Sequence, residues 1–215
     1  MALSTGPKKI NTAIFISGTG SNLKSLIKFS KHKKSPIIIN MIISNNSKAK
    51  GLQYSKIYKI KKKVFDFKNA LSEKKVINEL KKNNIDLICL AGFMKILSKS
   101  FINNFKGKIL NIHPSLLPKY KGLNTHEKAI KNKDKYSGCT VHFVNSKLDS
   151  GKIINQKKVI ISKFDTPKTL AKKILIQEHK LYPAAIMKIL SPWKKSLFQF
   201  LRFQHYPTHV QNFYQ

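Results

Sequence analysis

Arginine and acidic residues are scarce in this sequence. Arg202 is the only arginine among 42 lysine and arginine residues, and the chain has only nine aspartates and glutamates, which gives a net charge of +33. So basic a chain suggests nucleic-acid binding, but proteins that read phosphates and bases favour the bidentate guanidinium of arginine. The lysines are instead spread over the whole chain beside many isoleucines and asparagines. We interpret this composition as a drift towards A/T-rich codons, a hypothesis that a GC-rich gene would contradict.

Cysteine and long hydrophobic runs are also scarce. Cys89 and Cys139 are the only cysteines, which excludes a disulfide scaffold and a cysteine-rich zinc site. The longest apolar stretch, around residues 88–94, is far shorter than the roughly 20 residues that a membrane-spanning helix needs. The polar residues 1–9 do not resemble a secretory signal. Since 41% of the 215 residues are hydrophobic, the chain can bury the core of one domain, and we expect a soluble, cytoplasmic protein.

Apolar runs that alternate with periodic segments indicate an α/β fold. Short runs rich in β-branched residues predict strands at residues 12–17, 37–43, 64–67, 86–91, 109–112, 139–144 and 152–161. Apolar residues at helical spacing predict helices after Gly20 and at residues 72–83, 125–131 and 166–190, the last of them kinked or broken by Pro183. This alternation predicts a mostly parallel sheet with helices on both faces. The last strands have no helix between them, so we expect an antiparallel edge there.

A glycine turn follows the first predicted strand, in the segment Ser17-Gly18-Thr19-Gly20-Ser21-Asn22. A strand, a turn and a helix start in this order present backbone N–H groups and the positive end of a helix dipole to an anion. Ser21 and Asn22 add side-chain donors. The segment lacks the Gly-Lys-Ser/Thr of a P-loop and a full dinucleotide fingerprint. The turn therefore predicts either a phosphate site or an ordinary connection between two elements.

Asn111 and His113 lie at the end of a predicted strand, in the segment Asn111-Ile112-His113-Pro114-Ser115-Leu116-Leu117-Pro118. Open α/β sheets place their sites at the carboxyl ends of strands, and residues two apart in an extended chain point to the same side. An amide N–H and a protonated imidazole can both donate to one oxygen. Pro114 and Pro118 stiffen the segment, and the bond before Pro118 is a candidate cis peptide. This combination favours a functional histidine over a structural one.

Asp149 precedes a glycine turn between the last two predicted strands. Since the chain has only nine acidic residues, this carboxylate is a candidate partner for His113, whose pKa it would raise by favouring the imidazolium. The alternative is an aspartate that only stabilises the turn. We expect His142, in the preceding strand, to pack in the core rather than to take part in catalysis.

These segments together resemble the phosphoribosylglycinamide formyltransferases, folate-dependent enzymes of purine synthesis. The Asn-x-His with a distant Asp is common to enzymes that use 10-formyltetrahydrofolate, whereas the glycine loop and the run Leu-Leu-Pro-Lys-Tyr-x-Gly-Leu-x-Thr-His are more specific. The likeness extends from about residue 12 to about residue 189 and includes Gly18 to Asn22, Ala91-Gly92-Phe93-Met94, Asn111 to Gly122, Thr125-His126, Leu148-Asp149 and Gln177-Glu178-His179. It implies a catalytic domain at residues 12–190, between an N-terminal extension (1–11) and a tail of unknown role (191–215).

The resemblance implies transfer of the formyl group of 10-formyltetrahydrofolate, the co-substrate, to the amine of 5′-phosphoribosylglycinamide. The implied catalytic residues are Asn111, His113 and Asp149. The implied phosphoribosylglycinamide site comprises Gly20, Ser21, Asn22, Leu23 and Lys24 at the phosphate, and Leu175, Ile176, Gln177 and Glu178 at the ribose and glycinamide. The implied folate site comprises Met94, Lys95, Ile96, Leu97, Asn111, Asn145, Ser146, Lys147, Leu148 and Asp149.

The implied chemistry requires no metal and no covalent enzyme intermediate. The substrate amine, with a pKa of about 8, is partly neutral at cellular pH and attacks the formyl carbon itself. One departure from the family concerns the tail of the folate. The family often has an arginine near the start of the helix at Ser72, where this chain reads Ser72-Glu73-Lys74-Lys75. Either a lysine substitutes for it, or folate binding is weaker.

The sequence alone leaves alternative functions open. A 10-formyltetrahydrofolate hydrolase uses water in place of the amine, and a methionyl-tRNA formyltransferase shares the Asn-x-His core, but each carries an additional domain for which we expect too few residues here. A lysine-rich, non-enzymatic nucleic-acid binder would show salt-dependent affinity, yet it gives no reason for the three implied catalytic residues to occur together. We expect small-molecule substrates, no membrane or nucleic-acid partner, and a monomer or homodimer.

Overall fold

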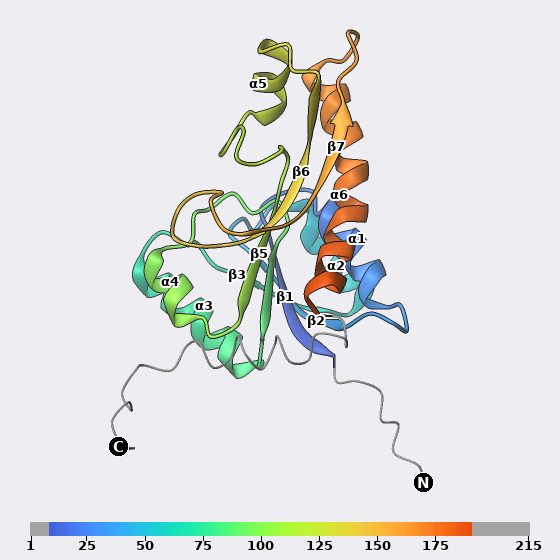
Figure 1. Ribbon diagram of the computed structural model, residues 1–215. Coiled ribbons are helices and arrows are strands. Elements are labelled where there is room, and N and C mark those ends of the chain that lie inside the picture. Colours follow the sequence, from blue (N-terminus) through green and yellow to red (C-terminus); the bar gives the residue numbers. More distant parts are fainter. Residues whose placement is uncertain (1–8, 191–215) are drawn as a thin grey trace, which may run out of the picture.

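The computed structural model describes residues 9–190, and its strands and helices alternate along most of the chain (Figure 1). The predicted tail at 191–215 and residues 1–8 of the predicted N-terminal extension lie outside this part. The strands are β1 (Ile10–Ile16), β2 (Ile37–Ser44), β3 (Lys61–Val64), β4 (Leu87–Leu90), β5 (Lys108–His113), β6 (Tyr136–Phe143) and β7 (Ile153–Ile160). The helices are α1 (Ser21–Ser30), α2 (Gln53–Tyr58), α3 (Ala70–Lys82), α4 (Lys99–Asn104), α5 (Thr125–Lys131) and α6 (Pro167–Leu190), and a 3₁₀ turn, η1 (Lys50–Leu52), precedes α2.

The strands form one seven-stranded sheet in the order β3-β2-β1-β4-β5-β6-β7. Pairing is parallel from β3 to β5 and antiparallel where β6 joins β5 and β7 joins β6. The predicted α/β fold with a mostly parallel sheet and an antiparallel C-terminal edge is therefore confirmed. The register of β5 on β6 places Asn111 opposite His142, which brings two polar side chains together near the end of β5.

Helices cover both faces of the sheet, as the sequence predicts (Figure 1). Alternate residues of β1 divide between two hydrophobic clusters, because successive side chains of a strand point to opposite faces. Ile14 and Ile16 pack in the cluster that contains residues of α1 and α6. Ala13 and Phe15 pack in the cluster that contains residues of α3 and α4. Burial on both faces explains why β1, β2 and β4 appear in the sequence as nearly continuous apolar runs.

The helices α2 and α4 and the turn η1 were not predicted from the sequence, and two predicted elements differ from their prediction. The third strand covers Lys61–Val64 rather than residues 64–67, and all four of its residues are exposed. A lysine-rich edge strand has no buried face and so no alternating pattern to detect. Pro183 lies inside α6 without ending it. The carbonyl of His179, which Pro183 cannot pair with because it lacks an N–H, accepts a hydrogen bond from the Ser25 hydroxyl at 2.9 Å.

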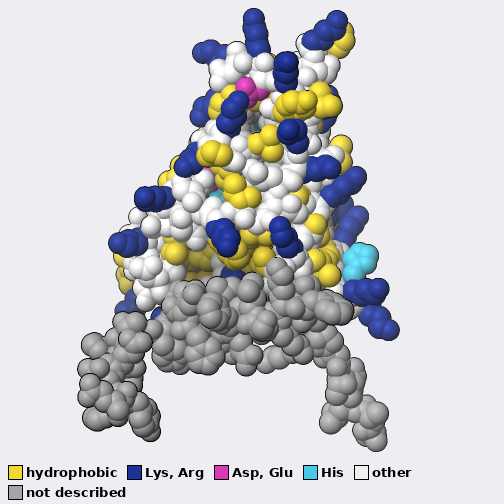
Figure 2. All heavy atoms as spheres, viewed as in Figure 1, with side chains coloured by type: hydrophobic (Ala, Val, Ile, Leu, Met, Phe, Trp, Pro, Cys, Tyr) yellow, Lys and Arg dark blue, Asp and Glu magenta, His cyan; other side chains and the backbone are white. Residues whose placement is uncertain are grey.

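Lysine side chains on the face seen in Figure 2 are dispersed rather than gathered in one patch. Figure 2 shows them scattered across the visible face with hydrophobic side chains between them. Such dispersal agrees with a compositional origin of the charge better than with a nucleic-acid groove. Within residues 9–190, no helix is both long enough and apolar enough to cross a membrane.

Candidate active site

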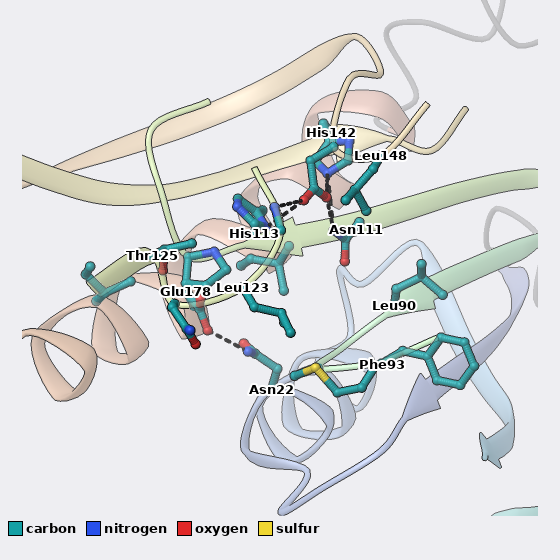
Figure 3. A pocket seen from close by; sticks show the side chains of 18 of the residues that line it. Asn22, Leu90, Phe93, Asn111, His113, Leu123, Thr125, His142, Leu148 and Glu178 are labelled. Atoms are coloured by element: carbon teal, nitrogen blue, oxygen red, sulfur yellow. Dashed lines mark hydrogen bonds and ion pairs between the residues drawn. The ribbon is translucent and has the colours of Figure 1, made fainter. Parts of the chain in front are cut away.

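A cavity of about 1020 Å³ opens where β4, β5 and β6 meet the segment after β4, the loops around α5 and the start of α6. Its position at the carboxyl ends of the parallel strands is the one that open α/β sheets use for ligands. The predicted catalytic residues all line this cavity, namely Asn111, His113 and Asp149. Figure 3 shows the side chains of Asn111, His113 and His142 gathered on one side of it.

His113 is the last residue of β5 and is almost fully buried. Its Nε2 lies 2.8 Å from the carbonyl oxygen of Tyr120, and its Nδ1 lies 3.3 Å from Oδ2 of Asp149. The Tyr120 carbonyl and the ionised Asp149 carboxylate are both hydrogen-bond acceptors only. The protonated ring, which has an N–H at each nitrogen, can donate to both. Burial lowers the pKa of His113, whereas the Tyr120 carbonyl and the Asp149 charge raise it, and the net pKa lies below the ordinary value. Asp149 thus raises the pKa of His113 as expected, but burial lowers it by more.

Asp149 is held in the site from three directions. The Gly122 N–H donates to its Oδ2 at 2.9 Å, and Nδ2 of Asn111 donates to its Oδ1 at 3.4 Å. Nε2 of His142 lies 3.6 Å from the same Oδ1. Burial raises the pKa of Asp149, but the contacts with His142 and Gly122 and the charge of His113 lower it by more in total. The pKa of this carboxyl group therefore lies below its ordinary value. The group is therefore an ionised carboxylate at neutral pH.

His142 belongs to this cluster, although the sequence suggested packing alone. It is buried, as expected, but its Nε2 lies 3.2 Å from Nδ2 of Asn111 across the β5–β6 pair. Its Nδ1 donates to the carbonyl oxygen of Phe143 at 2.8 Å. His142 and Asp149 thus fix which way the Asn111 amide faces. Only the strand register reveals this contact, and the sequence does not give that register.

A second polar pair lies apart from the catalytic cluster in the same cavity (Figure 3). Nδ2 of Asn22, in the first turn of α1, donates to Oε2 of Glu178 in α6 at 2.7 Å. Burial raises the pKa of Glu178 to about 7, although the hydrogen bond from Asn22 lowers it. The side-chain oxygen of Asn22 is buried without a hydrogen-bond partner, and such a group is normally paired with protein, water or ligand.

The glycine turn before α1 is shaped by a close backbone contact. Gly20 has a φ of +75°, and a Cβ at this position would lie 2.7 Å from the Cα of Gly51. Only glycine fits there without a shift of the backbone. The helix that follows has no side-chain cap and no acidic residue in its first turn, so its first N–H groups and its dipole are available to an anion.

The other predicted binding residues divide between the cavity wall and the surrounding structure. Gly20 contacts Gly51, Leu23 is buried in the core, and Lys24 lies over the ring of Tyr54. Ile176 and Gln177 do not line the cavity, because helical spacing turns them away from the face that carries residues 175 and 178. The predicted residues that do line it are Ser21, Asn22, Met94, Lys95, Ile96, Leu97, Asn145, Ser146, Lys147, Leu148, Leu175 and Glu178.

Further residues of the wall were not assigned from the sequence. Thr125 and His126 at the start of α5 and Lys168 and Lys172 in α6 contribute to the cavity. The Thr125-His126 pair was part of the resemblance and could have been assigned from it, whereas the two lysines carry no signal in so lysine-rich a chain. Among the residues that the structure describes, no cluster of His, Cys, Asp or Glu is arranged to hold a metal ion.

Comparison with known proteins relates the sequence to formyl transferases. Residues 10–186 match the family described as Formyl transferase. The human "Trifunctional purine biosynthetic protein adenosine-3" is 42% identical over 188 residues, which is 86% of this chain and 19% of that protein. The "Phosphoribosylglycinamide formyltransferase" of Haemophilus influenzae is 44% identical over 183 residues, 83% of this chain and 85% of that protein. The chain thus spans about a fifth of the length of the human relative and most of the bacterial one.

A solved structure shows the same fold over most of the chain. The phosphoribosylglycinamide formyltransferase from Brucella melitensis superposes with a TM-score of 0.81 at 40% sequence identity. The superposition covers 86% of this chain and 97% of that one.

Proposed function

The chain belongs to the formyl transferase family, and on that premise we propose that it is a phosphoribosylglycinamide formyltransferase. It transfers the formyl group of 10-formyltetrahydrofolate to the amine of 5′-phosphoribosylglycinamide, a step of de novo purine biosynthesis. The products are formylglycinamide ribonucleotide and tetrahydrofolate. The observation that carries the proposal is the convergence of Asn111, His113 and Asp149 in one cavity, with 3.3 Å between His113 and Asp149 and 3.4 Å between Asn111 and Asp149.

The phosphoribosylglycinamide occupies the part of the cavity between α1 and α6. The uncapped N-terminus of α1 suits its phosphate, and Ser21 and Asn22 line the cavity beside it. Glu178 offers a buried acceptor for the hydroxyls of the ribose. The unpaired oxygen of Asn22 gains a donor when the substrate binds.

The folate lies between the segment after β4 and the segment after β6. Met94 and Ile96 from the first and Leu148 from the second are at least half exposed and line the cavity, so a flat ring buries apolar surface on both sides. Lys95 and Lys147 lie in the same two segments, and Lys168 and Lys172 line the cavity from α6. These lysines supply positive charge for the carboxylates of the folate tail in place of the family's arginine.

The catalytic residues act on the oxygen of the formyl group. When the neutral amine adds to the formyl carbon, this oxygen gains negative charge and needs donors. The Asn111 amide donates by giving up its contact with Asp149 at 3.4 Å, the longer of its two contacts. His113 donates from Nε2 in its protonated form by giving up its contact with the Tyr120 carbonyl at 2.8 Å, while the ionised Asp149 stabilises the ring at Nδ1. Asp149 then receives the proton of the amine through water. As the intermediate collapses, the bond between the formyl carbon and the folate nitrogen breaks, and a proton returned through the same water leaves that nitrogen as the N–H of tetrahydrofolate.

A spectrophotometric assay of folate product release tests the proposal. Release from 10-formyltetrahydrofolate that depends on phosphoribosylglycinamide is the expected result. Release without the glycinamide substrate would indicate a hydrolase. The absence of release under both conditions would contradict an enzymatic function, and nucleic-acid titration at rising salt would then test the binding alternative.

A further inference from the structure

The segment that connects β4 to α4, residues 91–98, forms one wall of the cavity without regular secondary structure. Phe93 and Leu97 pack against the hydrophobic cluster beneath α3 and α4. Between them, Met94 is 66% and Ile96 is 73% exposed, and both line the cavity. Packing therefore holds two residues of the segment, but it does not determine the backbone path of the residues between them.

Ser17, directly after β1, holds the first half of this segment. The Met94 N–H donates to the Ser17 hydroxyl at 2.7 Å, and the Ser17 N–H donates to the carbonyl oxygen of Gly92 at 3.0 Å. The Ser17 hydroxyl in turn donates to the side-chain oxygen of Asn45, which follows β2. One serine thus joins the segment to the ends of two neighbouring strands.

Glu73, in the first turn of α3, holds the other end. Its side chain is buried, and both carboxylate oxygens accept hydrogen bonds from Ser98. Oε1 accepts from the Ser98 N–H at 3.0 Å, and Oε2 accepts from the Ser98 hydroxyl. Ser98 also caps α4 by accepting from the Phe101 N–H at 3.0 Å. Hydrogen bonds to a buried, charged acceptor are strong, so the start of α4 is fixed to α3.

We propose that Ser17 and Glu73 are positioning residues for the folate, which they do not touch. Neither side chain lines the cavity. Together they fix both ends of residues 94–97, so that the backbone and the two exposed apolar side chains present a preset surface to the flat ring. A surface that is ordered before binding loses less conformational entropy when the ligand arrives. The inference rests on the proposed function, which assigns this wall to the folate.

The test compares steady-state kinetics of Ser17→Ala and Glu73→Ala with the wild type. The KM for 10-formyltetrahydrofolate should rise about tenfold in each variant, the effect expected when one or two hydrogen bonds that order a binding surface are lost. The kcat should stay within about twofold, because the catalytic residues are untouched. Glu73→Gln keeps one acceptor oxygen for the Ser98 N–H and should restore most of the affinity. It keeps the proposal testable if Glu73→Ala fails to fold.

Two matched controls remove the same groups elsewhere. Ser55→Ala deletes a hydroxyl that donates to the Ile60 carbonyl at 2.7 Å, and Glu79→Ala deletes a carboxylate of α3 that pairs with Lys61 at 2.7 Å. The hydrogen bonds and ion pairs of these side chains go to residues outside the 91–98 segment, so both controls should keep the wild-type KM. An equal rise of the KM in the controls would overturn the inference, as would an unchanged KM in both Ser17→Ala and Glu73→Ala.

Amide hydrogen exchange separates this inference from the proposed function. In the wild type, added 10-formyltetrahydrofolate should slow exchange at residues 94–97; absence of slowing would contradict the folate assignment itself. In the ligand-free Ser17→Ala and Glu73→Ala variants, exchange at these residues should be faster than in the wild type. The positioning role alone would be overturned if folate slowed exchange in the wild type but the ligand-free variants exchanged as slowly as the ligand-free wild type.

Discussion

The carboxylate of Asp149 lies 3.3 Å from Nδ1 of His113, and both side chains are almost fully buried. Burial and the carboxylate act on the imidazole in opposite directions, and burial is the larger effect. The pKa of His113 therefore lies below its ordinary value, with Asp149 limiting the decrease.

Asp149→Asn should lower the pKa of His113 further, because it removes a charge that stabilises the imidazolium. The imidazolium is lost as pH rises through this pKa, so the decline of the pH–rate profile that reports this loss should move to lower pH. NMR titration of the His113 ring measures the shift directly. Asp165→Asn, which alters a carboxylate paired with Lys173 at 2.6 Å, should leave the titration unchanged. An equal or higher pKa of His113 in Asp149→Asn would refute the electrostatic role.

His113→Ala should abolish most formyl transfer while the fold persists. Removal of a proton donor or of a donor to a developing oxyanion costs roughly 10²- to 10⁴-fold in rate. Measurement of kcat/KM, with circular dichroism as a check of the fold, tests this prediction. His32→Ala, at an exposed position, is the matched control, and near-normal turnover in His113→Ala would remove His113 from the mechanism.

Much of the catalytic cluster could be predicted because it depends on local spacing. Asn111 and His113 are two residues apart in one strand, so their common direction follows from strand geometry alone. The direction of the pKa shift of His113 could not be predicted in the same way. It depends on how completely the surrounding elements exclude water from the ring, and no sequence pattern gives this quantity.

The other features that the sequence did not predict depend on contacts between distant segments or on an exposed edge of the sheet. His142 reaches Asn111 only through the β5–β6 register, and Ser17 reaches Met94 across 77 positions of the sequence. The lysines of β3 gave no strand signal because an exposed edge strand has no buried face to mark it. The buried strands β1 and β2, by contrast, were found within two residues of their ends, because burial on both faces requires long apolar runs.

The double substitution Ser21→Ala and Asn22→Ala should weaken binding of the phosphorylated substrate selectively. It removes two polar side chains at the start of α1 and the hydrogen bond from Asn22 to Glu178. The KM for phosphoribosylglycinamide should rise at least about tenfold, as the loss of one or more hydrogen bonds to a charged group predicts. The KM for 10-formyltetrahydrofolate should change little. Equal changes in both constants would contradict the assignment of this loop.

Glu178→Gln should make stability less dependent on pH. Burial raises the pKa of Glu178 in the folded protein from an ordinary 4.5 to about 7. The folded state therefore binds more protons than the unfolded state between these values, and the wild type loses stability as pH rises through this window. In thermal melts between about pH 5 and about pH 8, the stability of the variant relative to the wild type should increase as the pH rises. A difference that does not vary with pH would contradict the raised pKa.

The central claim is that the cluster of Asn111, His113 and Asp149 moves a formyl group from folate to a glycinamide amine. Its most direct test follows an isotopically labelled formyl group of 10-formyltetrahydrofolate by mass spectrometry in the presence of phosphoribosylglycinamide. The label should appear on the glycinamide ribonucleotide with the wild-type protein and should be nearly absent from it with His113→Ala. Label recovered as free formate, or transfer undiminished in His113→Ala, would contradict the claim.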